Sequence, residues 1–390
     1  MKGPALDEGE IRQKLTDFEA RFGSGGKPDL YFAPGRVNLI GEHTDYNSGL
    51  VLPMAIEQGT YLMIRQSDSS SVRLYSDKLE SEATFDPVAV EKTGDWADYV
   101  RGVFRFAKET CGDLPPFDGL FFGDLPLGAG LSSSASIELV TAMGLTSVGC
   151  DLSRKDAVKV SRRAENEFVG VSCGVMDQFT AAFARQGNAI LLDCNTLDYR
   201  LVPYNLPDAA TVIAHTGVYR KLGESPYNNR REECSEALRL LSKKLGYKEN
   251  LSQVTVNEFE RVKYLIPDTL ARRAEHVIYE NVRVEEAARC LENNNPERLG
   301  SLMNRSHASL RDNYEVSSPE LDAMQKISVE QPGVWGCRMT GAGFGGCVIA
   351  LVSRDALDKY MRQVANLYWK ATSLDPFFII TAPGEGARKL

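Results

Sequence analysis

The chain has 390 residues, of which 43% are apolar, and this suffices for two soluble domains with ordinary cores. Its formal net charge of -8 at pH 7 excludes a general nucleic-acid or anionic-membrane partner, so we expect small-molecule partners. Eight cysteines without a C-x-x-C pair and only four histidines indicate free thiols rather than a zinc site or a disulfide framework. The sequence shows no apolar signal core and no apolar run of membrane length, so we expect a cytoplasmic protein.

The first half of the chain mixes helical and strand patterns. A helix is predicted over 10–22, and a break rich in glycine and proline follows it. Short runs of apolar and β-branched residues predict strands at 50–56, 60–67, 72–76, 118–125 and 188–194. Further helices are predicted over 132–145, over 153–170 with Ser153 and Asp156 as a cap pair, and over 175–185.

Beyond about residue 200 the pattern starts again. A strand at 210–217 precedes predicted helices at 228–245, 257–263, 270–291 and 296–312. The last series is a strand-loop-strand at 334–352, a helix at 353–371 and a strand at 376–383. Because strands and helices do not alternate regularly, an α+β architecture is favoured over a doubly wound parallel sheet. We expect an N-terminal domain over 1–200 and a C-terminal domain over 201–390.

The segment 123–136, GDLPLGAGLSSSAS, places glycine turns directly before a predicted helix. Several backbone N–H groups and the positive end of the helix dipole would converge there and form an anion cradle. Ser132, Ser133 and Ser134 add hydroxyls that suit a phosphate or a Mg²⁺ ion. The segment is not a Walker loop, because no Gly-Lys-Ser/Thr follows. The structural alternative is a glycine turn that caps a tightly packed helix.

A second glycine-rich segment, MTGAGFGGC at 339–347, formally contains the G-x-G-x-x-G dinucleotide pattern. That pattern must open a helix, whereas a strand-like run follows directly here, so we do not interpret it as a dinucleotide site. A glycine loop between two strands fits better. Such a loop either lets a ligand or another backbone approach closely, or is a bulged hairpin.

Two carboxylates of the segment 164–179, AENEFVGVSCGVMDQF, are candidates for chemistry. Asp177 falls in the first turn of a predicted helix, where it either only complements the helix dipole or is kept ionised and aimed at a substrate hydroxyl. Glu165 lies at the margin of an apolar helix stripe and is either a solvated residue or a metal ligand. The residues alone leave both alternatives open.

The densest group of polar residues is APGRVNLIGEHTDYNSG at 33–49, directly before an apolar run. Glu42, His43 and Asp45 supply acceptors and a switchable donor at a spacing that suits the hydroxyls of a polyol, and Arg36 supplies a permanent charge for a phosphoryl oxygen. A lone histidine near apolar sequence is otherwise typical of a hydrogen-bonded structural residue.

These segments together resemble the galactokinase family of the GHMP small-molecule kinases. GRVNLIGEHTDYNSG is similar to its sugar signature, PLGAGLSSSAS to the phosphate loop and MTGAGFGGC to the third motif. GVSCGVMDQF and YRKLGESPYNNRREEC complete the order of motifs. The resemblance implies ATP-dependent phosphorylation of galactose at O1, a ribosomal-protein-like N-terminal half, a ferredoxin-like C-terminal half and an active site between them.

The resemblance also implies roles for particular residues. Asp177 would be the catalytic carboxylate, and Arg36 would neutralise charge on the transferred phosphoryl group. The sugar would be bound by Glu42, His43, Thr44, Asp45, Gly174 and Tyr227. ATP would be bound by Ser76, Trp96, Gly128, Ala129, Gly130, Leu131, Ser132, Ser133 and Ser134, and Mg²⁺ by Ser134 and Glu165. We expect a monomer without nucleic-acid or membrane partners.

Three other functions compete with this one. A related sugar 1-kinase acting on N-acetylgalactosamine, arabinose or a uronic acid would keep Arg36, Asp177 and the phosphate loop. Ser48, where the family commonly has Asp, and the unusual HTGVYRKL segment leave the sugar preference open. A non-catalytic galactose and ATP sensor is disfavoured by the intact phosphate loop and Asp177. An NAD-dependent dehydrogenase is disfavoured because a strand, and not a helix, is predicted directly after Gly346.

Overall fold

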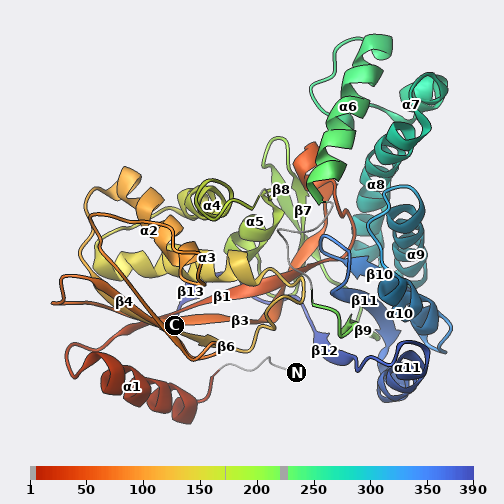
Figure 1. Ribbon diagram of the computed structural model, residues 1–390. Coiled ribbons are helices and arrows are strands. Elements are labelled where there is room, and N and C mark those ends of the chain that lie inside the picture. Colours follow the sequence, from red (N-terminus) through yellow and green to blue (C-terminus); the bar gives the residue numbers. More distant parts are fainter. Residues whose placement is uncertain (1–5, 172, 220–226) are drawn as a thin grey trace.

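The computed structural model describes residues 6–171, 173–219 and 227–390, and its strands form three sheets (Figure 1). The six-stranded sheet has the order β13 (Arg388–Lys389), β1 (Asp29–Asn38), β3 (Pro53–Gln66), β6 (Phe117–Gly123), β4 (Val72–Ser76) and β5 (Ser81–Phe85). The four-stranded sheet has the order β10 (Val334–Thr340), β11 (Cys347–Ser353), β9 (Ala209–His215) and β12 (Phe377–Thr381). A small sheet joins β2 (Leu50–Val51), β7 (Asn188–Asp193) and β8 (Tyr199–Pro203).

The helices of the first half are α1 (Glu8–Phe22), α2 (Asp98–Cys111), α3 (Ser133–Gly144), α4 (Arg154–Arg163) and α5 (Met176–Phe183). Those of the second half are α6 (Tyr227–Leu245), α7 (Val256–Val262), α8 (Asp268–Glu292), α9 (Pro296–Asp312), α10 (Pro319–Val329) and α11 (Leu357–Thr372). The helices predicted from the sequence are confirmed, whereas α2 and α10 were not predicted. None of the helices in the described ranges is both long and apolar enough to cross a membrane.

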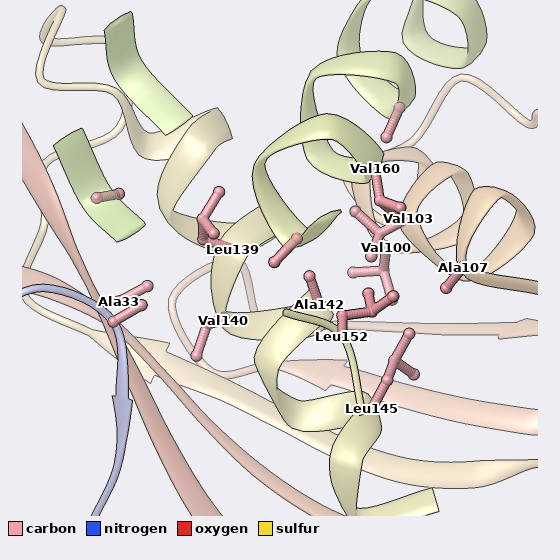
Figure 2. Close-up of a cluster of buried hydrophobic side chains, with 14 of the residues drawn as sticks. Ala33, Val100, Val103, Ala107, Leu139, Val140, Ala142, Leu145, Leu152 and Val160 are labelled. Atoms are coloured by element: carbon pink, nitrogen blue, oxygen red, sulfur yellow. The ribbon is translucent and has the colours of Figure 1, made fainter. Parts of the chain in front are cut away.

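The core of the first half lies between the six-stranded sheet and its covering helices. Contacts join α3 and α5 to β1 and β3, and α2 and α4 pack on α3. Figure 2 shows part of this core, in which Val100 and Val103 of α2 lie beside Ala142 of α3 and Val160 of α4. On the opposite face of the sheet lies α1 (Figure 1), whose Phe18 is fully buried.

The two halves share a third core. Ile213 and Ile349 of the four-stranded sheet belong to one buried cluster with Val37 and Met54 of the first half. The last strand, β13, also returns to the first half and pairs with β1. The division into 1–200 and 201–390 therefore stays a prediction, because buried contacts and the C-terminal strand both cross it.

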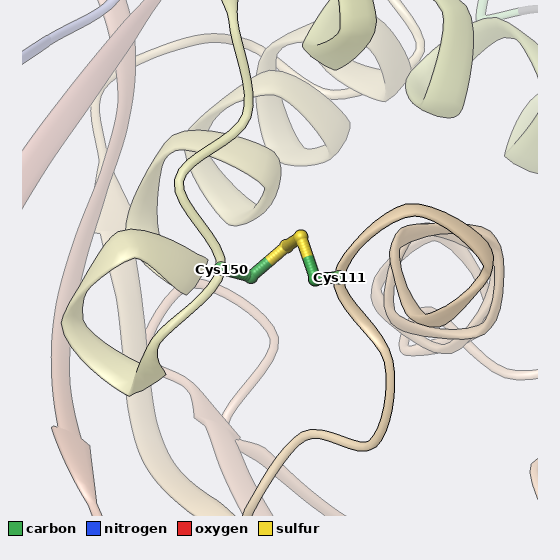
Figure 3. Close-up of a disulfide and its surroundings, with 2 residues drawn as sticks. All are labelled: Cys111 and Cys150. Carbon is green, nitrogen blue, oxygen red and sulfur yellow. A yellow bond between two sulfur atoms is a disulfide. The ribbon is translucent and has the colours of Figure 1, made fainter.

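A disulfide joins Cys111 at the end of α2 to Cys150 (Figure 3). The sequence-based expectation that all eight cysteines are free thiols is therefore wrong for this pair. The two residues are 39 positions apart, and only the packing of α2 on α3 brings their backbones together. Within the described residues, the other six cysteines form no disulfide.

Candidate active site

Residues from both halves of the chain line a cavity of about 620 Å³. Most of the site residues predicted from the sequence lie on its wall, namely Arg36, Glu42, His43, Asp45, Ser76, Trp96, Gly128, Gly130, Ser132, Ser133, Ser134, Glu165, Gly174, Asp177 and Tyr227. Gly341 and Ala342 of the loop between β10 and β11 also lie on the wall. The glycine loop thus links two strands, as predicted, and reaches the cavity from the second half.

Three predicted binding residues do not line the cavity. Thr44 is fully buried, and its hydroxyl donates to the carbonyls of Gly41 at 2.8 Å and Leu50 at 2.7 Å. Ala129 and Leu131 are likewise buried in the core shared by the two halves. These three residues therefore support the binding loops from behind, and the prediction that they contact a ligand stays a prediction.

A bulge in β1 brings Arg36 and the phosphate loop together. The register between β1 and β3 shifts between Pro34 and Arg36, and the Arg36 N–H donates to the carbonyl of Leu131 at 3.2 Å. A Cβ atom on Gly35 would lie 2.7 Å from that carbonyl, so glycine is what permits the close approach of loop and strand.

Arg36 forms a bidentate ion pair with Asp177. Nε donates to Oδ1 at 2.7 Å and Nη2 to Oδ2 at 2.6 Å, while Nη1 donates to the carbonyl of Gly130 at 2.8 Å. Burial acts to lower the pKa of Arg36, but the charge and hydrogen bonds of Asp177 outweigh it, so the pKa lies above its ordinary value. Asp177 lies in the first turn of α5, as predicted, and is thereby fixed beside the phosphate loop.

The phosphate loop turns through three left-handed residues. Gly128, Gly130 and Ser132 have φ values of 68°, 79° and 61°, and α3 begins at Ser133. The loop and the first turn of a helix thus border the cavity together, which is the arrangement expected for an anion cradle.

Asp45 lies on the wall of the cavity in close contact with Gly174. A Cβ atom on Gly174 would lie 1.7 Å from the Asp45 Oδ2 atom, so no larger residue fits there without moving the carboxylate. Burial, followed by the negative charge of Asp177, raises the pKa of Asp45 to about 7. The carboxylate is therefore close to its point of ionisation at neutral pH.

His43 is held on two sides. Its Nδ1 lies 2.7 Å from the Tyr46 hydroxyl, and its Nε2 lies 3.2 Å from the Ala342 carbonyl. Because a carbonyl oxygen can only accept a hydrogen bond, the proton of the ring is on Nε2. The Tyr227 ring packs beside it, with a centroid separation of 5.6 Å. His43 is therefore a hydrogen-bonded residue of the loop and also part of the wall.

Glu42 joins the first sequence motif to the third. Its Oε1 accepts from the Gly341 N–H at 2.6 Å and from the Thr340 hydroxyl at 3.0 Å, and Arg338 Nη1 lies 3.7 Å away. Glu42 and Arg338 are both buried, so this carboxylate holds the glycine loop in addition to lining the cavity. These contacts leave Oε2 unused.

The opposite part of the cavity is more aromatic. Trp96 lies on its wall, and its buried Nε1–H has no hydrogen-bond partner among the described residues, so it is a donor that a ligand could satisfy. Sequence reasoning assigned no role to Tyr99, which lies in the first turn of α2 three positions after Trp96, nor to Tyr46 and Lys78. All three carried a signal, because Tyr46 lies inside the first motif, Lys78 lies two positions after Ser76 and Tyr99 lies three positions after Trp96.

Ser134 and Glu165 are close enough to serve one cation. Glu165 accepts from Gln178 Nε2 at 2.7 Å and is 3% exposed. Burial raises the pKa of Glu165, and the nearby Ser134 hydroxyl acts to lower it. Glu165 is therefore buried rather than solvated, in a π-helical turn over Ala164–Val169. No group of three or more His, Cys, Asp and Glu side chains converges among the described residues, but Mg²⁺ needs only one or two protein oxygens when phosphates complete its shell.

Comparisons with known proteins agree with this geometry. The galactokinase galactose-binding signature matches residues 16–66, and the GHMP kinase N-terminal and C-terminal domains match 98–185 and 287–370. The galactokinase of Fusobacterium nucleatum is 43% identical, with 97% of this chain and 100% of the relative covered. That of Bacillus subtilis is 42% identical, with 97% and 99% covered. The chain belongs to the galactokinase family.

Solved structures place the fold in the same family. The crystal structure of Lactococcus lactis galactokinase complexed with galactose superposes with a TM-score of 0.93 at 38% identity, covering 97% of this chain and 100% of that one. A mevalonate kinase from Methanococcus jannaschii, at 18% identity and a TM-score of 0.67, shares the fold alone. The predicted two-domain GHMP kinase fold is thus confirmed, and the chain is a kinase of the galactokinase family.

Proposed function

We propose that this galactokinase-family enzyme transfers the γ-phosphoryl group of ATP to O1 of galactose and releases galactose 1-phosphate and ADP. The observation that carries the proposal is the Arg36–Asp177 ion pair on the wall of one cavity. The pair contacts the phosphate loop, because Arg36 Nη1 donates to the Gly130 carbonyl and Ser132 Oγ donates to Asp177 Oδ2. Gly174, three positions before Asp177, lies against Asp45. A proton acceptor and a cation therefore stand where a phosphate donor and a sugar acceptor would meet.

Each member of the pair has one role in the transfer. Asp177 accepts the proton that O1 loses as its oxygen bonds to the γ-phosphorus and the bond to the β-phosphate oxygen breaks. Arg36 neutralises charge on the phosphoryl oxygens and holds the carboxylate in place through two hydrogen bonds. Because phosphoryl transfer depends mostly on positioning and electrostatics, the cradle of the phosphate loop and this pair suffice without a Walker lysine.

ATP occupies the part of the cavity between the phosphate loop and Trp96. The unpartnered Nε1–H of Trp96 and the neighbouring Tyr99 and Ser76 support a nucleotide pocket there. Ser134 and Glu165 hold Mg²⁺, which when bound neutralises negative charge on the phosphates.

The sugar occupies the part lined by Asp45, His43, Gly174, Tyr227 and Glu42. Carboxylate oxygens and an imidazole suit a ring of hydroxyl groups, and the Lactococcus lactis relative that superposes so well was crystallised with galactose. Six of the eight cysteines lie outside the one disulfide of the described residues, which supports the cytoplasm as the place of action.

An ADP-release assay with Mg²⁺-ATP tests this proposal against galactose, N-acetylgalactosamine, arabinose, glucuronate and glucose, with NMR locating the new phosphate. We expect the highest turnover on galactose, with phosphate on O1. A strong preference for another sugar would keep the kinase chemistry and overturn the assignment of the sugar. Binding of galactose and ATP without turnover on any sugar would instead identify a sensor.

A further inference from the structure

The Ser132 side chain does not make the contact that its position in the helix predicts. Ser132 is the N-cap residue of α3, where a serine side chain usually accepts a hydrogen bond from the first turn of the helix. Here it makes no capping hydrogen bond, and its backbone has a left-handed φ of 61°. A non-glycine residue in this conformation is uncommon, and such strain gathers at functional sites.

Instead of capping the helix, the Ser132 hydroxyl hydrogen-bonds to Asp177 of the Arg36–Asp177 ion pair. Ser132 Oγ donates to Asp177 Oδ2 at 2.6 Å, and Ser132 is 8% exposed. Oδ2 also accepts from Arg36 Nη2 at 2.6 Å, so it has two donors. Of the three hydrogen bonds from Ser132 and Arg36, only the one from Arg36 Nε reaches Oδ1. An ionised carboxylate has about four lone-pair sites, two on each oxygen. The remaining site is therefore on Oδ1.

We propose that Ser132 is a positioning residue that fixes the Asp177 carboxylate and makes Oδ1 the atom that receives the proton of the sugar hydroxyl. This inference rests on the proposed function. Ser132 belongs to the loop that holds the phosphates, so its hydrogen bond sets the angle between the proton acceptor and the phosphate donor. The Arg36 contacts to the carbonyls of Gly130 and Leu131 anchor the same loop from the other side.

A different role was predicted for this side chain from the sequence. There, Ser132 was grouped with Ser133 and Ser134 as a phosphate ligand. A phosphate ligand contributes mainly to nucleotide affinity, whereas a residue that aims the acceptor contributes to the chemical step after both substrates are bound. The two roles therefore differ in which kinetic parameter changes when the hydroxyl is removed.

The test compares Ser132→Ala and Ser132→Gly with the wild type. Alanine removes the hydroxyl and keeps the backbone strain, and glycine removes both, so the pair separates the hydrogen bond from the strain. We expect kcat on galactose to fall about 10- to 100-fold in both variants, because a misaimed acceptor costs turnover. The dissociation constants of galactose and Mg²⁺-ATP, measured by calorimetry, should stay within about threefold of the wild type.

Two further variants complete the design. Ser373 is an exposed serine with a φ of 59° at the end of α11, and Ser373→Gly controls for relief of left-handed strain, with no change in kcat expected. In an Asp177→Asn background, Ser132→Ala should cost little more, because its partner is already lost.

Three results would overturn the inference. Wild-type kcat in Ser132→Gly would show that the hydroxyl is not needed. A raised ATP dissociation constant with unchanged kcat would identify a phosphate ligand instead. If the wild type phosphorylates none of the sugars in the panel, the proposed function itself is wrong. The wild type is therefore assayed before any variant is made.

Discussion

Glu42 accepts a hydrogen bond of 2.6 Å from the backbone N–H of Gly341, so a carboxylate of the first motif directly holds the glycine loop of the third. Arg338 stands behind it, 3.7 Å away and fully buried. Burial lowers the pKa of Arg338, while the charges of Glu42 and Glu280 oppose that effect. A residue assigned to the sugar therefore also stabilises the contact between two distant parts of the chain.

Glu42→Ala should consequently affect stability as well as sugar binding. Removing the carboxylate leaves a buried guanidinium without one of its counter-charges, and we expect the free energy of unfolding to fall by about 3 kcal/mol. Urea denaturation measures this loss, and the galactose KM should rise while the ATP KM changes little. Glu42→Gln is the matched control, because its amide oxygen can still accept from Gly341. An unchanged unfolding midpoint in Glu42→Ala would contradict the role given to this contact.

The Arg36–Asp177 pair predicts an asymmetry between two inactive variants. We expect Asp177→Ala and Arg36→Ala each to lose about 10²-fold or more of kcat, because both groups act on the transition state. The side chain of Arg36 is 6% exposed and that of Asp177 is 23% exposed. Asp177→Ala leaves the more buried charge, that of Arg36, without its partner. This variant should therefore lower the melting temperature more than Arg36→Ala does. Near-normal turnover in either variant would refute its catalytic role.

The raised pKa of Asp45 predicts a pH-dependent affinity for the sugar. Burial and the charge of Asp177 bring the pKa of Asp45 to about 7, so the ligand-free protein holds a proton there below that pH. If the ionised carboxylate accepts sugar hydroxyls, galactose affinity rises as the pH increases through 7 and falls as it decreases. Calorimetric titration without nucleotide between pH 5.5 and 8.5 measures this. Asp45→Asn should bind more weakly and show a flatter profile, and an identical pH profile in both proteins would contradict the assignment.

Local patterns in the sequence predicted local structure well. Ser153 does accept from the Asp156 N–H at 3.2 Å, and Gly170 does end the segment in a left-handed conformation. Residue types and spacing already made Arg36, Asp45 and Asp177 of the cavity wall candidates, and the resemblance to known motifs added Gly174 and Tyr227. Helix α2 was missed although its apolar residues Val100, Val103 and Ala107 have helical spacing.

What the sequence could not supply are contacts between distant positions. Glu42 and Gly341 are 299 positions apart, and Ser132 and Asp177 are 45 apart. The motifs predicted that these residues share a site, but not that one carboxylate oxygen of Glu42 binds the loop or that Ser132 turns away from its helix. Such details follow from backbone conformation and burial, which a pattern of residue types does not specify.

Gly174 offers the most direct test of the geometry on the sugar side. A Cβ atom there would lie 1.7 Å from Asp45 Oδ2, which is far too close for two non-bonded atoms, so Gly174→Ala must displace the carboxylate or the loop. We expect the galactose KM to rise about tenfold or more, because one misplaced charge-assisted hydrogen bond costs about 1.5–3 kcal/mol, while the ATP KM changes little. Gly26→Ala is the matched control, since nothing lies within 4 Å of the Cβ position there. A galactose KM unchanged in Gly174→Ala would mean that Asp45 does not contact the sugar, and an equal rise in both variants would point to a general loss of stability instead.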